Sequence, residues 1–163
     1  MSPELHRPVA VDRIGALGLD LTVEAGAAEC AALARRMQLP AIAELRCTFH
    51  VERDHADALV ANGYLHARLT QTCVVSLEDF LVTIDERFTV RCVPAGQESD
   101  DPDPAAIDEI GYAEGVLDLG EAVAEQLALA LDPYPHAPGA VLPALADEPD
   151  ASPFVALGSL RRH

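Results

Sequence analysis

The residues best suited to chemistry are four cysteines, and their spacing argues against a metal centre. Cys30, Cys47, Cys73 and Cys92 are separated by 17, 26 and 19 residues, without a C-x-x-C pair. A zinc site needs three or four thiolates or imidazoles to converge, typically at short spacings. The six histidines form no H-E-x-x-H motif. We therefore expect packed free thiols, surface histidines and no bound metal or other cofactor.

The sequence also lacks the common catalytic and phosphate-binding motifs. G-x-S-x-G, G-x-x-x-x-G-K and G-x-G-x-x-G are all absent. With 27 acidic residues, carboxylate pairs are unavoidable and do not indicate acid–base catalysis. The sequence therefore predicts a binding protein and not an enzyme. The alternative is an enzyme or redox-sensitive protein that uses a reactive Cys73, which would require an exposed, acidic thiol near a histidine.

The formal net charge of −16 is unevenly distributed along the chain. Residues 92–150 contain 14 acidic residues and no arginine, whereas residues 151–163 contain two arginines and no acid. Because RNA phosphates attract cations, this charge disfavours direct contact with RNA. The acidic region suits a basic partner, and it equally suits plain solubility.

Periodicity predicts the elements that position these residues. Helical spacing predicts a first helix over residues 22–38, with Thr22 as its N-cap and Glu24 in its first turn. Period-two alternation predicts strands over residues 45–51, 59–75 and 80–92, with one buried face. Within the second strand, Asn62-Gly63 indicates a bulge or kink.

The second half of the chain reads as a loop, a helix and a tail. Residues 94–114 are acidic and proline-rich without periodicity, which predicts a mobile loop. Asp118 then caps a helix in which Glu121 completes a variant capping box. Beyond Pro133 a proline-rich stretch leads to an apolar-then-basic end. This end either folds back on its own domain or is presented to another protein.

These elements predict an α+β fold: an antiparallel sheet of about four to five strands, packed against an N-terminal and a C-terminal helix. Residues 1–135 form the domain, with the acidic loop at 94–114, and residues 136–163 form the proline-rich tether and tail. The first residues lack a signal peptide, and no uncharged apolar run of about 18 residues occurs. We therefore expect a cytoplasmic protein without a membrane span.

Three stretches of the chain resemble the YceD family of large ribosomal RNA subunit accumulation proteins. Residues 69–78 (LTQTCVVSLE) are similar to the family's strand ending in C-x-R-C-L-E, and residues 116–133 to its I-D-L-x-E helix. Residues 152–161 (SPFVALGSLR) look like its closing N-P-F-A-x-L-x-x-L-K. Ser76 stands at the second cysteine position, and the later cysteine cluster of some relatives is absent. Metal binding suggested for cysteine-rich relatives is therefore not expected here.

The resemblance implies a role in synthesis, processing or stability of large-subunit (23S) ribosomal RNA, without an established reaction. Combined with the acidity, it predicts a non-enzymatic factor that binds a basic protein of ribosome assembly or RNA processing. The residues expected to contact the partner are Cys73, Leu77, Glu78, Asp118, Glu121, Glu125, Pro153, Phe154, Leu157, Leu160 and Arg161.

Overall fold

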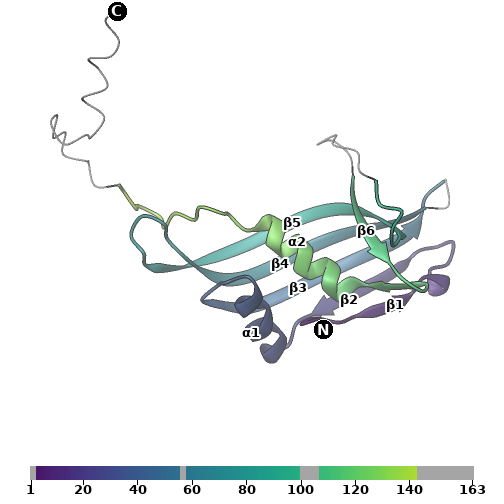
Figure 1. The fold of residues 1–163 in the computed structure, drawn as a ribbon, viewed down its shortest axis with the longest axis horizontal. Helices are drawn as coiled ribbons and strands as arrows, with labels where there is room; N and C mark the ends of the chain where they lie inside the picture. The colour runs from purple at the N-terminus through teal and green to yellow at the C-terminus, as the bar shows by residue number, and fades with distance from the viewer. Residues whose placement is uncertain (1–2, 56–57, 100–106, 143–163) are drawn as a thin grey trace, which may run out of the picture.

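A long, twisted sheet of five strands forms the body of the protein, and the predicted α+β class is confirmed (Figure 1). The computed structural model describes residues 3–55, 58–99 and 107–142. In spatial order the strands are β2 (Leu19–Glu24), β3 (Ala41–Arg53), β4 (Leu59–Thr72), β5 (Asp79–Pro94) and β6 (Asp108–Tyr112). A second, two-stranded sheet pairs β1 (Pro8–Ala10) with β7 (Val116–Asp118), and a short 3-10 turn, η1 (Val11–Arg13), follows β1.

The three central strands follow the predicted alternation, with one exception. Most of their apolar side chains point to one buried face and most polar side chains occupy the other, although Leu81 of β5 is 79% exposed. The bulge predicted at Asn62-Gly63 is wrong, because β4 pairs with both neighbours there without a shift. Gly63 instead makes room for an aromatic ring: a Cβ at this position would lie 2.2 Å from Cζ of Phe88. The irregularity lies in β3, between Ile42 and Glu44.

The first helix, α1 (Ala27–Arg36), is shorter than predicted. Thr22 and Glu24 belong to β2, which pairs antiparallel with β3, so Thr22 is not the N-cap. Gly26 occupies that position, and its N–H donates to Glu29 Oε2 at 2.7 Å. The alanine-rich run from Ala25 made the end of β2 and the start of α1 hard to separate in the sequence. The alternation of residues 19–24 fits a strand, but it was not distinguished from the helical spacing that follows.

The predicted loop at 94–114 contains a strand, so that part of the prediction is wrong. β6 pairs with β5 in parallel, from Val90 with Asp108 to Pro94 with Tyr112. The sheet is therefore mixed and not entirely antiparallel. A strand that runs parallel to its sequence neighbour requires a long crossover connection. Here the connection between β5 and β6 is acidic and proline-rich, and this composition concealed the five-residue strand β6 that follows it. Residues 100–106 of the connection lie outside the described residues.

Helix α2 (Leu119–Ala130) begins at Asp118, as predicted, and packs on the sheet face that α1 also covers (Figure 1). Its fully buried stripe, Leu119, Val123 and Leu127, joins the sheet's inner face in one core. Three cysteines, Cys30, Cys47 and Cys92, belong to this core, as expected. Burial raises the pKa of the Cys47 thiol to about 12.

The chain after α2 runs to the β4–β5 hairpin. Gln71 Nε2 donates to the Asp132 carbonyl oxygen at 3.1 Å, and the Val74 N–H donates to the Pro135 carbonyl oxygen at 2.9 Å. These bonds hold the start of the predicted tether against the sheet; the domain boundary at residue 135 stays a prediction. Within the described ranges, no helix is long and apolar enough to cross a membrane.

Candidate functional site

Acidic side chains from the N-terminal segment (residues 3–7) and from the β7–α2 junction line a pocket of about 580 Å³ beside the start of α2. Its lining residues are Pro3, Glu4, Arg36, Ile110, Gly111, Asp118, Glu121 and Glu125. The lining thus contains four carboxylates and one guanidinium. The N-terminal segment, α1, β6 and the β7–α2 junction all contribute to it.

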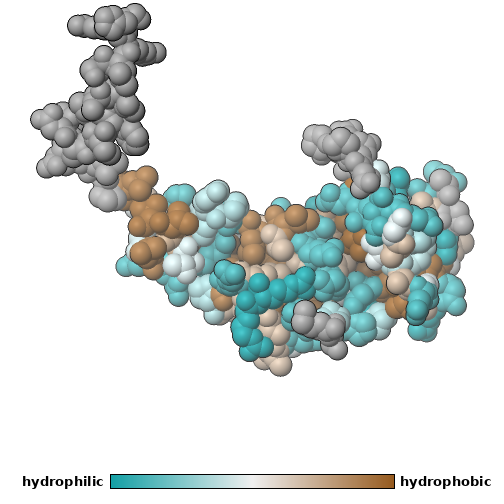
Figure 2. Space-filling view, in the orientation of Figure 1, coloured by the Kyte–Doolittle hydropathy of each residue, from teal (hydrophilic) through white to brown (hydrophobic). Residues whose placement is uncertain are grey.

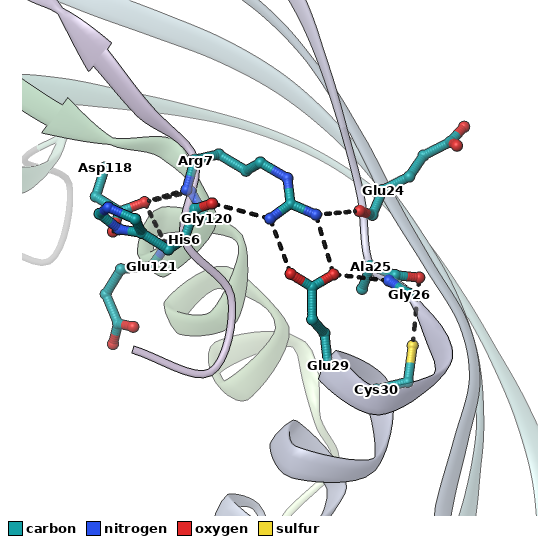
Figure 3. A network of polar contacts seen from close by, with 10 residues as sticks. All are labelled: His6, Arg7, Glu24, Ala25, Gly26, Glu29, Cys30, Asp118, Gly120 and Glu121. Carbon is teal, nitrogen blue, oxygen red and sulfur yellow. Dashed lines mark hydrogen bonds and ion pairs between the residues drawn. The ribbon is translucent and has the colours of Figure 1, made fainter. Parts of the chain in front are cut away.

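Asp118 fixes one side of the pocket because it joins two distant segments (Figure 3). Its Oδ1 accepts the Gly120 N–H at 3.0 Å, which caps α2, and the Arg7 N–H at 2.8 Å. His6 Nδ1 lies 2.5 Å from Oδ2. Partial burial opposes the charged carboxylate, but the Arg7 N–H and the His6 ring outweigh it and lower the pKa of Asp118. The side chain therefore remains an anion at neutral pH.

Arg7 is paired with Glu29, away from the pocket lining (Figure 3). Its two terminal nitrogens bind the two Glu29 oxygens at 2.8 and 3.0 Å, and Nη2 also donates to the Glu24 carbonyl oxygen. The Arg7 guanidinium lowers the pKa of Glu29, with help from the Gly26 N–H. Such a bidentate pair is specific in geometry. The pair holds the N-terminal segment against α1, and the Glu29 carboxylate compensates the charge of Arg7.

Gly120 allows the N-terminal segment to lie directly on the first turn of α2. A Cβ at this position would lie 2.4 Å from the Leu5 carbonyl oxygen, so that no larger residue fits without movement. The Leu119 N–H donates to the Arg7 carbonyl oxygen at 3.0 Å, and the Leu5 side chain is fully buried. This close approach brings Glu4 to the acidic side chains of α2.

The charges in the pocket are only partly compensated. Arg36 Nη2 lies 2.6 Å from Glu121 Oε1, and Arg36 Nη1 lies 3.1 Å from Glu4 Oε2. Among the described residues, Glu125 has no ion-pair partner, and desolvation together with the Glu121 charge raises its pKa. Two carboxylates thus share one guanidinium while a third lacks a cation. An added cationic group would stabilise this arrangement, as lysine and arginine side chains do.

Cys73 and Leu77 lie elsewhere, in the loop of the β4–β5 hairpin. The Cys73 side chain is fully covered, yet it lies outside the core with which its thiol was expected to pack. Its Sγ accepts the N–H groups of Val75 and Ser76, both at 3.4 Å. The Ser76 hydroxyl, and then the N–H groups of Ser76 and Ala137, lower the pKa of Cys73 to about 6.

A larger hollow, of about 690 Å³, lies on the polar face of the sheet. Its lining includes His50, Tyr64 and Arg87. Side chains of both signs line it: His50 Nδ1 lies 2.8 Å from Asp20 Oδ1, and the exposed Arg87 guanidinium lies over the Tyr64 ring. This hollow therefore concentrates charge of neither sign.

The structure brings together only part of the predicted site. Asp118, Glu121 and Glu125 line the acidic pocket, whereas Cys73, Leu77 and Glu78 share the hairpin loop. The remaining predicted residues lie outside the described part of the chain; they are Pro153, Phe154, Leu157, Leu160 and Arg161. Glu4 and Arg36 were missed because the pairs they form join residues 32 and 85 positions apart. Within the described ranges, no three histidine, cysteine or acidic side chains are placed to hold a metal ion.

Comparison with protein families places this chain in a known family. A search of curated proteins found no match, nor did a search of solved structures. The family model "Large ribosomal RNA subunit accumulation protein YceD" matches residues 61–153. The match contains the cysteine-bearing loop and the capped helix, and it ends where the apolar-basic segment begins. Because the match covers more than half of the sequence, the chain belongs to the YceD family.

Proposed function

We propose that this protein supports the accumulation of large-subunit (23S) ribosomal RNA in the cytoplasm, without catalysis, by binding a basic protein of ribosome assembly or RNA processing. The observation that carries the proposal is the acidic pocket, where four carboxylates face one arginine. Its residues Asp118, Glu121 and Glu125 come from the stretch that resembles the family's helix. The family name supports the link to ribosomal RNA.

Electrostatics favour a protein partner over RNA. With a net charge of −16, the chain attracts basic proteins at long range and repels phosphates. The pocket then supplies short-range selection, because a lysine or arginine side chain finds carboxylates already held in place by Arg7 and Arg36. Among the residues that the structure describes, no serine, cysteine, histidine or lysine lines the pocket. Its side chains are suited to binding a cation.

Affinity capture with charge-neutral variants tests the pocket. Glu121→Gln/Glu125→Gln removes two pocket charges, whereas Glu52→Gln/Glu86→Gln removes two exposed charges elsewhere. The long-range field changes equally in both variants. We expect the pocket variant to bind the captured basic protein about tenfold more weakly, which corresponds to ~1.4 kcal/mol, and the control to bind nearly as the wild type does. Equal losses, or a partner that disappears after RNase treatment, would contradict the proposal.

A rescue experiment connects the pocket to ribosomal RNA. In a strain that lacks the gene, the wild-type protein and the Glu52→Gln/Glu86→Gln control should restore the level of large-subunit RNA. The Glu121→Gln/Glu125→Gln variant should not, although it stays folded: loss of the partly exposed Arg36–Glu121 pair should lower its stability by less than about 1 kcal/mol. Full rescue by the pocket variant would show that the pocket does not perform this function.

A second candidate function is thiol chemistry at Cys73, which the lowered pKa favours. The full coverage of the side chain opposes it, since a nucleophile must reach its substrate. Cys73→Ala separates the two candidates in the same rescue experiment. Lost function with unchanged stability would favour the thiol, and retained function would favour binding.

A further inference from the structure

Exposed apolar side chains mark the end of the molecule opposite to the acidic pocket. We name as the tip patch Val74 and Leu77 of the β4–β5 loop together with Tyr134, Val141 and Leu142 of the chain after α2. Each of these side chains is at least 47% exposed, and Leu77 is 77% exposed. Figure 2 shows brown surface at this end, where the described chain finishes. Contiguous exposed apolar surface usually indicates a contact with another segment or protein.

Hydrogen bonds hold the two parts of the tip patch together. The Val74 N–H donates to the Pro135 carbonyl oxygen at 2.9 Å, and Gln71 Nε2 at the end of β4 donates to the Asp132 carbonyl oxygen at 3.1 Å. A turn then follows, in which the Ala140 N–H donates to the Ala137 carbonyl oxygen at 3.0 Å. The bond from Val74 to Pro135 thus ties the chain that leads to Val141 and Leu142 to the hairpin loop.

The loop holds Leu77 in an unfavourable backbone conformation while exposing its side chain. Its φ is +59°, which costs a residue with a Cβ about 1–3 kcal/mol. The Leu77 N–H donates to the Cys73 carbonyl oxygen at 2.9 Å, and the Cys73 N–H donates to the Glu78 carbonyl oxygen. These bonds fix the loop in this shape. The exposed Leu77 side chain adds little packing within the domain to offset this strain. A leucine at this position is therefore explained by a contact with a segment outside the described residues.

The surroundings of the tip patch are acidic. Residues 71–82 and 128–142 contain Glu78, Asp79 and Asp132, and neither stretch contains an arginine. A segment that fits here would have apolar side chains followed by positive charge. The same chain carries such a segment after residue 153: Phe154, Leu157 and Leu160 are followed immediately by Arg161 and Arg162.

We propose that residues 154–162 dock on the tip patch of the same molecule, with the apolar side chains on Leu77 and its neighbours and the two arginines beside the carboxylates. Eleven residues, 143–153, connect Leu142 to Phe154. Even fully extended, a linker of this length spans at most ~40 Å, and because it begins at Leu142 of the patch itself, the segment stays within reach of the patch. Its effective concentration there is in the millimolar range, which makes even weak contacts effective.

Backbone amide shifts in the full-length protein test the proposal. Phe154→Ser/Leu157→Ser removes two apolar contacts, whereas Ser152→Ala/Ser159→Ala alters the same segment without removing an apolar side chain. We expect the first variant to shift the amide signals of residues 74–78 and 137–142, independently of protein concentration, and the second to leave them unchanged. Unchanged signals in the first variant would overturn the proposal. A difference that vanishes on dilution would overturn it too, because the patch would then bind a second copy.

A peptide of residues 152–163, added to the full-length Phe154→Ser/Leu157→Ser variant, provides the second test. It should move the same signals back towards their wild-type positions in a saturable way. Adding Leu77→Ser to this acceptor should weaken the peptide several-fold while the core signals stay in place. If the peptide instead shifts Glu121 and Glu125, the segment occupies the acidic pocket and the proposal is wrong. Neither test depends on the function proposed for that pocket.

Discussion

The acidic pocket and the hairpin loop lie at opposite ends of α2, and they are built in different ways. The pocket depends on bonds between residues far apart in the chain, such as those from His6 and Arg7 to Asp118. The loop is closed by bonds within residues 73–78 and by one neighbouring segment. A site made of long-range pairs is coupled to the stability of the whole fold, whereas a site in one loop is not. A substitution of the same kind should therefore lower the free energy of unfolding more at the pocket than in the hairpin loop.

The largest effect is expected for Asp118→Ala. The substitution removes the cap of α2 and leaves the Arg7 and Gly120 N–H groups without their acceptor. Loss of a cap costs about 1 kcal/mol, and an unsatisfied buried donor costs about 1–3 kcal/mol. We expect the free energy of unfolding to fall by about 2–4 kcal/mol, measured by urea denaturation. The control Asp20→Ala, whose side chain is 87% exposed, should change it by less than about 1 kcal/mol.

Gly120→Ala tests the close approach of the N-terminal segment to α2. The new Cβ would meet the Leu5 carbonyl oxygen, and relief requires displacement of backbone. We expect a loss of about 1–3 kcal/mol in thermal unfolding. At Gly15, where no atom lies within 4 Å of an added Cβ, alanine should be close to neutral. Equal stability of the two variants would show that residues 5–7 move aside without cost.

The pH dependence of stability should reveal the bonds to Cys73. Its pKa is about 6 in the folded protein, compared with 9.0 for an ordinary thiol, so folding favours the thiolate. This contribution is fully present above pH 9 and is lost as the pH falls through about 6. Between pH 6 and 9, the wild type should therefore gain stability relative to Cys73→Ala as the pH rises. Urea denaturation across this range measures the difference.

The control for this experiment is Cys47→Ala. Burial raises the pKa of the Cys47 thiol, so this residue does not titrate between pH 6 and 9. The variant should lower stability by removing a buried side chain, but it should retain the wild-type slope against pH. If Cys73→Ala also retains that slope, the thiol does not accept these hydrogen bonds in solution.

The smallest effect is expected for Leu77→Gly. Glycine adopts a positive φ without strain, although its unfolded chain has more conformational freedom. We expect stability to stay unchanged or to rise by up to about 1 kcal/mol in urea denaturation. A loss of more than about 1 kcal/mol would show that the Leu77 side chain packs within the domain, and the distinction between the two sites would weaken.

The sequence predicted the strands that alternate over many residues and missed the short ones. β3, β4 and β5 each contain 13 or more residues, so their period-two pattern is clear. β2 and β6, with six and five residues, were read as helix and loop. Their alternating patterns are too short to stand out from the sequence around them, which is alanine-rich beside β2 and acidic beside β6. Because β6 supplies Ile110 and Gly111 to the pocket, this error also concealed one wall of the site.

The site shows the same limit. Asp118 could be identified because a helix cap is a local pattern, in which the side chain binds the next backbone N–H groups. Glu121 was expected to complete the capping box but pairs with Arg36, which lies 85 residues earlier. Glu4 has no distinguishing neighbours in the sequence, and only the fold places it beside α2. Pairs of this kind cannot be read from one sequence without its tertiary structure.

The bonds from His6 and Arg7 to Asp118 also have a consequence for the time at which the protein becomes competent. A chain is synthesised from its N-terminus, so residues 4–7 exist long before the helix on which they rest. Glu4 and Glu125 therefore face the same pocket only after the roughly 120 residues between them have been made. Until Asp118 has been made, the only described ion-pair partners of residues 4–7 are Glu29 and Arg36 of α1. A chain that stops before α2 cannot offer this pocket, so any molecule that binds there selects chains in which α2 has already been made.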